Sequence, residues 1–357
     1  MQHPDGPDRV HGPLRADGPD RAGGPDRAAL RAHVPTMVRS DAVPSTQDIA
    51  AALLEQGQQP PFAVTAVEQT AGRGRLQRPF RSPRGSSLAL TLACRTTLSP
   101  ATRSWLPLLV GVAAHAALIA ELPALTGRVG LKWPNDLHTA EGGKLGGILV
   151  EGRGEDLVLM GIGVNLRGPI LDSDGFPLPG AAWLLGSGGM LAADEVTAGR
   201  ELTAGLELTA GLEPAAGQEP AADGKPEVAL ELAQLRRRLE ETIAGAIVES
   251  LCRLEAADGD AEACGLAERY TMICLTVGRS VRIDPLGTAT AAAHHGAPSP
   301  LHGIARGVDR IGRLLVEGED GVTAVALGDI QHLRALPPPG TISDHPHPSH
   351  HQEDHGT

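Results

Sequence analysis

Aromatic residues are scarce in this chain, since phenylalanine, tryptophan and tyrosine together make up 2% of its 357 residues. Glycine and proline are abundant instead, with 45 and 29 copies. A large core therefore has to be built from alanine, leucine and valine, with glycine- and proline-rich stretches between the packed segments. The length allows one large domain and a second, smaller one.

An excess of positive charge is also missing. The formal net charge is −12 at pH 7, whereas non-specific binding to nucleic acid needs a basic surface. We therefore expect no nucleic acid among the partners. A local basic site for a phosphate-bearing ligand is still compatible with this charge.

Cysteine pairs and membrane-spanning runs are not found either. The four cysteines contain no CxxC pair, which is typical of reduced thiols in a cytoplasmic protein: Cys94, Cys252, Cys264 and Cys274. There is no continuous apolar run of about 18 residues and no signal-peptide core. We expect a soluble, cytoplasmic protein with no membrane partner.

Two familiar motifs of nucleotide and acyl chemistry are absent. The phosphate-binding motif GxxxxGK(S/T) and the nucleophile motif GxSxG do not occur. The segment Gly161-Ile162-Gly163-Val164-Asn165 lacks the third glycine and the following helix of a dinucleotide-binding fingerprint. Any use of ATP therefore requires a different architecture.

Three segments lack the large apolar residues of a packed core. Residues 1–35 repeat Gly-Pro-Asp-Arg, which predicts a disordered arm that is too short for a DNA-reading helix-turn-helix. Residues 186–227 repeat Leu-Thr-Ala-Gly-Leu-Glu and are interpreted as a low-complexity insertion. The His-rich residues 337–357 predict a second disordered tail.

Hydrophobic periodicity fills the rest of the chain. Ser45 or Thr46 is expected to cap a short helix, and longer helices are predicted over residues 107–122 and 228–254. Short strands and glycine turns over residues 276–336 favour a small barrel. Further strands are predicted at 62–68, 87–93, 129–133, 145–151 and 156–165.

A loop rich in glycine and arginine follows the first of these strands. Gly72-Arg73-Gly74-Arg75 and Arg78 place three guanidinium groups close together. Glycine lets the backbone approach a ligand, and arginine offers forked donors to phosphate or carboxylate oxygens. We interpret this segment as a loop that closes over an anionic ligand. A solvated basic turn is equally compatible with the residues alone.

Two lysines border predicted strands. Lys132 is a charge in an apolar strand and needs a partner, which Asp136 in the turn Trp-Pro-Asn-Asp could supply. Lys144 precedes an apolar strand, from which its ammonium could stabilise the charge that develops when a carboxylate attacks ATP. Lys144 could instead be an ordinary surface lysine in a turn, and the Trp-Pro-Asn-Asp segment could be a rigid turn and nothing more. Asn165, at the end of the last strand, could contact a nucleobase or cap a turn.

The motifs become specific when they are taken in order. The segments STQD (45–48), GRGR (72–75), SPRG (82–85), KWPNDL (132–137), GGKLGGILVE (142–151) and GIGVNL (161–166) resemble the biotin–protein ligase family. The resemblance covers residues 40–185 and 228–336, and is to members that lack an N-terminal DNA-binding domain. It implies an α+β fold: a mixed sheet with helices, like that of class II tRNA synthetases, over residues 36–270, and a C-terminal SH3-like β-barrel over 271–336.

The resemblance also implies a reaction. ATP and Mg²⁺ would convert biotin to biotinyl-5′-adenylate, and biotin would pass to a lysine of a biotin carboxyl carrier domain of a biotin-dependent carboxylase. A homodimer is compatible with the sequence. The family's usual Asn, Gly and Trp are replaced by Gln47, Gln77 and Phe80, and we expect Gln77 to stiffen the loop because it adopts a positive φ less freely than glycine.

Site residues are carried over position by position. Biotin would lie against Ser45, Thr46, Gln47, Gln69, Gly72, Arg73, Gly74, Arg75 and Lys144. Catalysis would depend on Arg73, Arg75 and Lys144, while ATP and the adenylate would contact Arg78, Lys132, Asn165 and Trp183, supported by Asn135 and Asp136. The Mg²⁺ ligands stay unassigned.

Three other functions remain as alternatives. A lipoate–protein ligase shares the same logic of acid activation, although the pairing of KWPND with GRGR favours biotin. The substitutions at Gln47 and Gln77 leave open a catalytically weak module that binds biotin or its adenylate. A structural scaffold with disordered arms is disfavoured by the number of spaced motifs.

Overall fold

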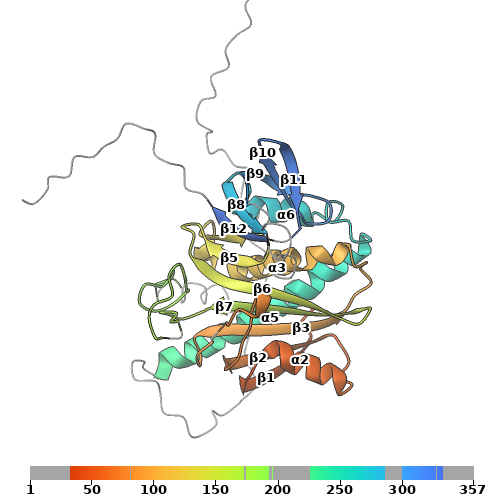
Figure 1. The fold of residues 1–357 in the computed structure, drawn as a ribbon. Coiled ribbons are helices and arrows are strands. Elements are labelled where there is room, and N and C mark those ends of the chain that lie inside the picture. The colour runs from red at the N-terminus through yellow and green to blue at the C-terminus, as the bar shows by residue number, and fades with distance from the viewer. Residues whose placement is uncertain are drawn as a thin grey trace, which may run out of the picture.

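The computed structural model describes residues 33–80, 82–172, 174–192, 195, 226–285, 300–326 and 328–332. The expected N-terminal arm, apart from residues 33–35, lies outside the described residues, as do most of the 186–227 insertion and the whole His-rich tail. The described part comprises a large sheet with helices on both faces and a smaller sheet near the C-terminus (Figure 1).

The large sheet has seven strands in the order β1-β2-β3-β7-β6-β5-β4. Strands β1 and β2 are parallel, and every other neighbouring pair is antiparallel. The strands are β1 (Thr36–Val43), β2 (Phe62–Gln69), β3 (Ser87–Arg95), β4 (Val129–Lys132), β5 (Asp136–Thr139), β6 (Lys144–Arg153) and β7 (Leu157–Asn165).

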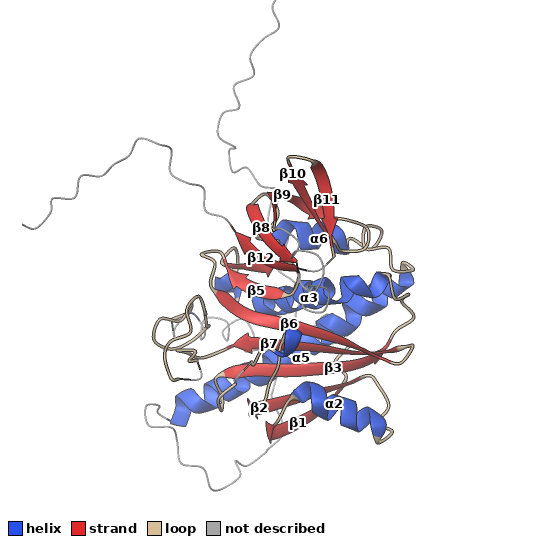
Figure 2. Ribbon diagram, viewed as in Figure 1, coloured by secondary structure: helices blue, strands red, loops and turns tan. Residues whose placement is uncertain are grey.

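Helices cover both faces of this sheet (Figure 2), and its central strands are mostly buried. Helix α2 (Thr46–Glu55) packs on one face, where Phe62 and Val64 of β2 contact Ala50. Helices α3 (Leu106–Glu121) and α5 (Pro226–Ala256) pack on the other face, which receives Ala63 and the leucines of β3. This alternation follows from the two-residue period of a strand.

The remaining helices are short. They are the 3₁₀ turns η1 (Arg75–Gln77), η2 (Thr102–Trp105) and η3 (Pro123–Leu125), and the α-helix α6 (Leu266–Ile273). Together η2 and α3 form the stretch Thr102–Glu121, which is long and apolar enough to cross a membrane. It meets this test by mean hydropathy, while Arg103, Ser104 and His115 interrupt it, so it is not a continuous apolar run of the kind that the sequence was expected to lack. Of its apolar window 72% is buried inside the protein, so core packing accounts for its composition.

The smaller sheet has five antiparallel strands in the order β11-β10-β9-β8-β12. They are β8 (Ser280–Pro285), β9 (Leu301–Val308), β10 (Leu314–Gly318), β11 (Gly321–Val325) and β12 (Gly328–His332). This C-terminal sheet is tied to the large one through the β4–β5 turn. The indole Nε1 of Trp133 donates a hydrogen bond to the Gly312 carbonyl (3.0 Å), and Leu275 N donates to Leu131 O (2.7 Å).

Candidate active site

A cavity of about 150 Å³ opens on the α2 face of the large sheet. Its floor is formed by the middle of β3, β6 and β7, and its walls by the start of α2, the arginine-rich loop and the β4–β5 turn. The predicted supporting residues Asn135 and Asp136 line it, and so do all the predicted biotin and catalytic residues except Gly72: Ser45, Thr46, Gln47, Gln69, Arg73, Gly74, Arg75 and Lys144. Their roles in ligand binding remain predictions.

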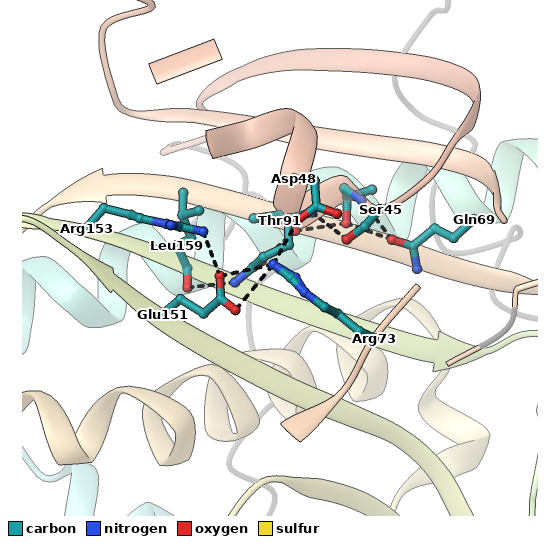
Figure 3. A network of polar contacts seen from close by, with 10 residues as sticks. Ser45, Asp48, Gln69, Arg73, Thr91, Glu151, Arg153 and Leu159 are labelled. Carbon is teal, nitrogen blue, oxygen red and sulfur yellow. Dashed lines mark hydrogen bonds and ion pairs between the residues drawn. The ribbon is translucent and has the colours of Figure 1, made fainter. Parts of the chain in front are cut away.

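Polar side chains at the start of α2 form one wall of the cavity (Figure 3). Ser45 caps the helix, as expected, because its side chain accepts a hydrogen bond from Gln47 N. Thr46 donates from both its backbone N (2.8 Å) and its hydroxyl (3.1 Å) to Gln69 Oε1. The Thr46 hydroxyl also lies 2.9 Å from that of Thr91, a residue that sequence reasoning did not single out. The wall therefore holds hydroxyl and amide groups in fixed positions.

The longer side chain of Gln47 is accommodated by a glycine. Its Oε1 accepts a hydrogen bond from the Thr91 hydroxyl (3.0 Å), and its Nε2 donates to Leu159 O (3.4 Å). A Cβ atom on Gly161 would lie 2.8 Å from this Oε1, so the bare backbone of β7 makes room for the extra methylene. The amide of Gln47 is thus bonded within the protein wall.

The arginine-rich loop is a compact turn held by its own backbone. Phe80 N donates to Gly72 O and Gly74 N donates to Arg78 O, both at 2.8 Å. A side chain on Gly72 would overlap the Phe80 carbonyl oxygen, so this position requires glycine. The loop's positive φ belongs to Leu76 (54°) and not to Gln77, the residue that we expected to stiffen the loop. Leu76 is 60% exposed and lies at the cavity rim.

Arg73 is clasped by two carboxylates, which Figure 3 shows on either side of its guanidinium. Its Nη2 lies 2.8 Å from Asp48 Oδ1 and 3.4 Å from Glu151 Oε1, and Glu151 also pairs with Arg153. The other terminal nitrogen, Nη1, is buried and has no hydrogen-bond partner among the described residues. Because an unsatisfied buried donor is costly, Nη1 is available for an anionic ligand in the cavity.

Arg75 and Arg78 also line the cavity. Arg75 Nη1 donates to Asn135 Oδ1 (2.9 Å), which joins the loop to the β4–β5 turn. Asn135 Nδ2 donates in turn to Ile148 O (2.9 Å) on β6. Arg78 is exposed at the rim. The three arginines therefore surround the same space from one loop.

Lys144 and Asp136 form an ion pair at the other end of the cavity. Lys144 Nζ lies 2.8 Å from Asp136 Oδ1, and the lysine side chain passes over Gly147. Burial alone would raise the pKa of Asp136, but the neighbouring His138 imidazole and the charge of Lys144 hold the pKa below its usual value. Asp136 is therefore a carboxylate at neutral pH.

The predicted ATP contacts Lys132, Asn165 and Trp183 are not among the residues that line this cavity. Asn165 Nδ2 donates to Ala182 O (2.9 Å), which fastens the loop after β7 to the sheet. Trp183 follows in this loop, packs against Gly168 and donates from Nε1 to Ser187 O (3.1 Å). The same loop pairs with the backbone of Lys144, whose N donates to Gly180 O (2.7 Å).

The sequence is similar to those of known biotin ligases. A model of the biotin/lipoate A/B protein ligase family matches residues 40–166. A biotin--[acetyl-CoA-carboxylase] ligase of Mycobacterium tuberculosis is 30% identical over 273 residues, which cover 75% of this chain and 78% of the relative. The bifunctional ligase/repressor BirA of Escherichia coli is 38% identical over 108 residues, covering 29% of this chain and 32% of the relative.

A similar fold occurs among solved structures. The biotin protein ligase of Aquifex aeolicus, in complex with biotin and ATP, superposes with a TM-score of 0.54 at 19% sequence identity. The match covers 84% of this chain and 99% of that structure. At this identity the likeness shows the shared fold: the large mixed sheet, its helices and the small C-terminal sheet.

Proposed function

This chain belongs to the biotin–protein ligase family, and from that premise we propose that it uses ATP to form biotinyl-5′-adenylate and then transfers biotin to a lysine of a biotin carboxyl carrier domain. The observation that carries the proposal is the cavity beside α2. A polar wall, the buried Nη1 of Arg73 and the ammonium of Lys144 all border the same space. These groups suit a ligand that has a polar head and a reacting carboxylate.

The wall also favours biotin over lipoate. The ureido ring of biotin carries two N–H donors and one carbonyl acceptor, whereas the dithiolane ring of lipoate has no comparable polar groups. Hydroxyl and amide groups from Ser45, Thr46 and Gln69 surround this part of the cavity. Thr46 and Gln69 are already bonded to each other, so the wall offers a ligand the remaining hydrogen-bonding capacity of these hydroxyl and amide groups, which the ureido ring can use and the dithiolane ring cannot.

In the first step a biotin carboxylate oxygen forms a bond to the α-phosphorus of ATP. The bond from that phosphorus to the bridging oxygen breaks, and pyrophosphate leaves with the electron pair. Negative charge develops on the phosphoryl oxygens, where fixed cations lower the barrier. Arg73, Arg75 and Lys144 supply these cations from two sides of the cavity.

In the second step the neutral amine of the carrier lysine attacks the carbonyl carbon of the mixed anhydride. The new amide bond forms, AMP leaves with the electron pair of the C–O bond, and the amine loses one proton. The adenylate must be kept from water until this attack. The arginine-rich loop, fixed by its own backbone and by Arg75 to Asn135, covers the cavity for that purpose.

Mg²⁺ enters in our proposal as the MgATP complex. Among the described residues no three His, Cys, Asp or Glu side chains gather into a metal site. This fits a magnesium ion that is bound mainly by phosphate oxygens and water, as is usual for nucleotide enzymes. When bound, the ion would neutralise part of the negative charge on the ATP phosphates and on the leaving pyrophosphate.

Several finer features belong to the same proposal. We assign the catalytic domain to residues 36–270 and an SH3-like barrel to residues 271–336, on the basis of the five-stranded antiparallel sheet there. Trp183, Asn165 and Lys132 are assigned to the nucleotide, because the loop that carries Trp183 is bonded to the backbone of Lys144 beside the cavity. A cytoplasmic location and a carboxylase carrier as acceptor follow from the reaction.

Adenylation by itself tests this assignment. The wild-type protein, given ATP, Mg²⁺ and biotin, should release pyrophosphate and form biotinyl-adenylate, measured by mass spectrometry, and lipoate should not replace biotin. Lys144→Ala should slow adenylation by about 100-fold, because it removes one fixed charge from the transition state. Arg95→Ala, which changes an exposed ion pair at the far end of β3, should leave the rate unchanged. Adenylation of lipoate alone, or a wild-type rate in Lys144→Ala, would contradict the assignment.

A further inference from the structure

Resting on the proposed function, we propose that His138 is a positioning residue for the adenylation step. Its imidazole faces the second carboxylate oxygen of Asp136, while Lys144 binds the first, and together they fix where the Lys144 ammonium lies. The sequence motifs did not include His138, and no step described above uses it.

The strand geometry brings the three residues together. Asp136 and His138 are two positions apart on β5, so both project toward the same face of the sheet. Lys144 is the cross-strand partner of His138, and Gly147 is that of Asp136. The Lys144 side chain reaches diagonally across Gly147 to the carboxylate, passing within ordinary contact distance of the glycine. His138 thus approaches Asp136 from the same strand, β5, and Lys144 approaches it from the neighbouring strand, β6.

The imidazole is oriented by its other nitrogen. His138 is 7% exposed, and its Nδ1 lies 3.2 Å from the Gly142 carbonyl oxygen. A carbonyl oxygen only accepts hydrogen bonds, so Nδ1 carries a proton. The buried Nε2 has no hydrogen-bond partner among the described residues and lies 3.8 Å from Asp136 Oδ2. Asp136 Oδ2 also only accepts hydrogen bonds, so a hydrogen bond there requires a second proton on Nε2, as in the imidazolium, and a shift of about 1 Å to reach hydrogen-bond distance.

The contacts of Asp136 determine where the ammonium of Lys144 lies. A lysine side chain is flexible, and its ammonium is a point charge whose place depends on its partner. Asp136 Oδ1 is that partner, at 2.8 Å. A carboxylate that is contacted at both oxygens is restricted in rotation, so the ammonium is held where the reacting carboxylate and α-phosphate meet. A small displacement of such a group lowers the rate of a reaction strongly.

A purely structural role would look different. In that case the bond from Nδ1 to Gly142 would be the only useful contact of His138, and any replacement that kept it would suffice. Two substitutions separate the roles because asparagine places its amide near the position of Nδ1 and glutamine near the position of Nε2. His138→Asn keeps a donor for Gly142 and removes the group that faces Asp136, whereas His138→Gln keeps that group.

The test measures biotin-dependent pyrophosphate release by the full-length chain, with KM values for biotin and ATP. We expect His138→Asn to lower kcat about tenfold with both KM values unchanged within about twofold, and His138→Gln to keep kcat within about threefold of wild type. Thermal unfolding of each variant checks the fold. In an Asp136→Asn background, His138→Asn should cause no further loss of kcat, because the partner through which it acts has been removed.

The outcomes are distinct. Equal kcat in wild type and His138→Asn would overturn the proposal, and so would equal losses in the Asn and Gln variants. If His138→Asn does not fold, the comparison of His138→Ala with and without Asp136→Asn decides, because alanine also removes the group that faces Asp136; full additivity of these two substitutions would overturn the proposal. A wild-type chain that forms no biotinyl-adenylate would instead refute the proposed function.

Discussion

His332 links the C-terminal sheet to the active-site turn, and its replacement should change how stability depends on pH. Its Nε2 lies 3.1 Å from the hydroxyl of Thr276, which is fully buried and accepts a hydrogen bond from Trp133 N (3.1 Å). Burial, together with the nearby charges of Lys132, His138 and Arg279, lowers the pKa of His332 from 6.5 to about 4.

The sign and size of the effect follow from this shift. The unfolded chain binds a proton at His332 near pH 6.5 and the folded chain only near pH 4, so acid favours unfolding between these values. Stability from this group is complete above pH 6.5, falls as the pH drops toward 4, and is constant below. At about 1.4 kcal/mol per pH unit the full shift amounts to about 3 kcal/mol. Because the ring is only partly buried, we expect about 1 to 2 kcal/mol.

Urea unfolding of wild type and His332→Gln at pH 7 and pH 4.5 measures how much His332 contributes to the pH dependence of the free energy of unfolding. Glutamine keeps a hydrogen-bond acceptor for Thr276 and does not titrate. The wild type should lose about 1 to 2 kcal/mol more than the variant over this range. The exposed His302 on β9 provides a matched control, since His302→Gln should retain the wild-type pH dependence. Equal losses in wild type and His332→Gln would refute the reasoning.

Two further substitutions test the packing around the site and the core. Gly163→Ala should weaken biotin binding about tenfold, measured by calorimetry. The new Cβ would lie 2.5 Å from the Phe80 ring and push this ring toward the cavity. An unchanged affinity for biotin would show that the ring does not crowd the cavity. Glu121→Ala should lower the free energy of unfolding by about 2 kcal/mol, measured by urea denaturation, because the buried Glu121 carboxylate accepts a hydrogen bond from Thr242. Glu141 is exposed, so Glu141→Ala should leave the free energy of unfolding unchanged. Similar losses in the two glutamate variants would contradict that account.

Local signals predicted the central elements well. The alternation from Phe62 and from Ser87 gave the buried strands β2 and β3, and the cap at Ser45 gave the start of α2. The recurrence of apolar residues from Val228 to Leu254 gave most of α5. In each case the pattern of a single segment reflects the face that it buries.

Other elements depend on partners far away in the sequence. Strand β5 has only four residues and exists because β4 and β6 pair with it on either side. Strand β1 is half exposed and is fixed by parallel pairing with β2, more than twenty positions away. Helix α6 begins after a left-handed Gly265 and spans only eight residues, so its periodicity is too short to recognise.

In the candidate site, too, some residues were predicted from local sequence patterns, and others depend on strand pairing between distant segments. Arginine and lysine in glycine-rich segments indicated an anion site, and the structure gathers Arg73, Arg75 and Lys144 around one cavity. The carboxylate partner Glu151 was not predicted, because strand pairing decides which side chains of β6 face the loop. The place of His138 depends likewise on the pairing of β5 with β6.

Transfer of biotin to a carrier domain is the most direct test of the central claim. The protein would be incubated with ATP, Mg²⁺ and labelled biotin or labelled lipoate, and a biotin carboxyl carrier domain would then be added. We predict labelled biotinyl-adenylate first and then a carrier that is labelled at one lysine, with biotin only. A labelled carrier with lipoate alone, or neither adenylate nor labelled carrier with biotin, would contradict the account.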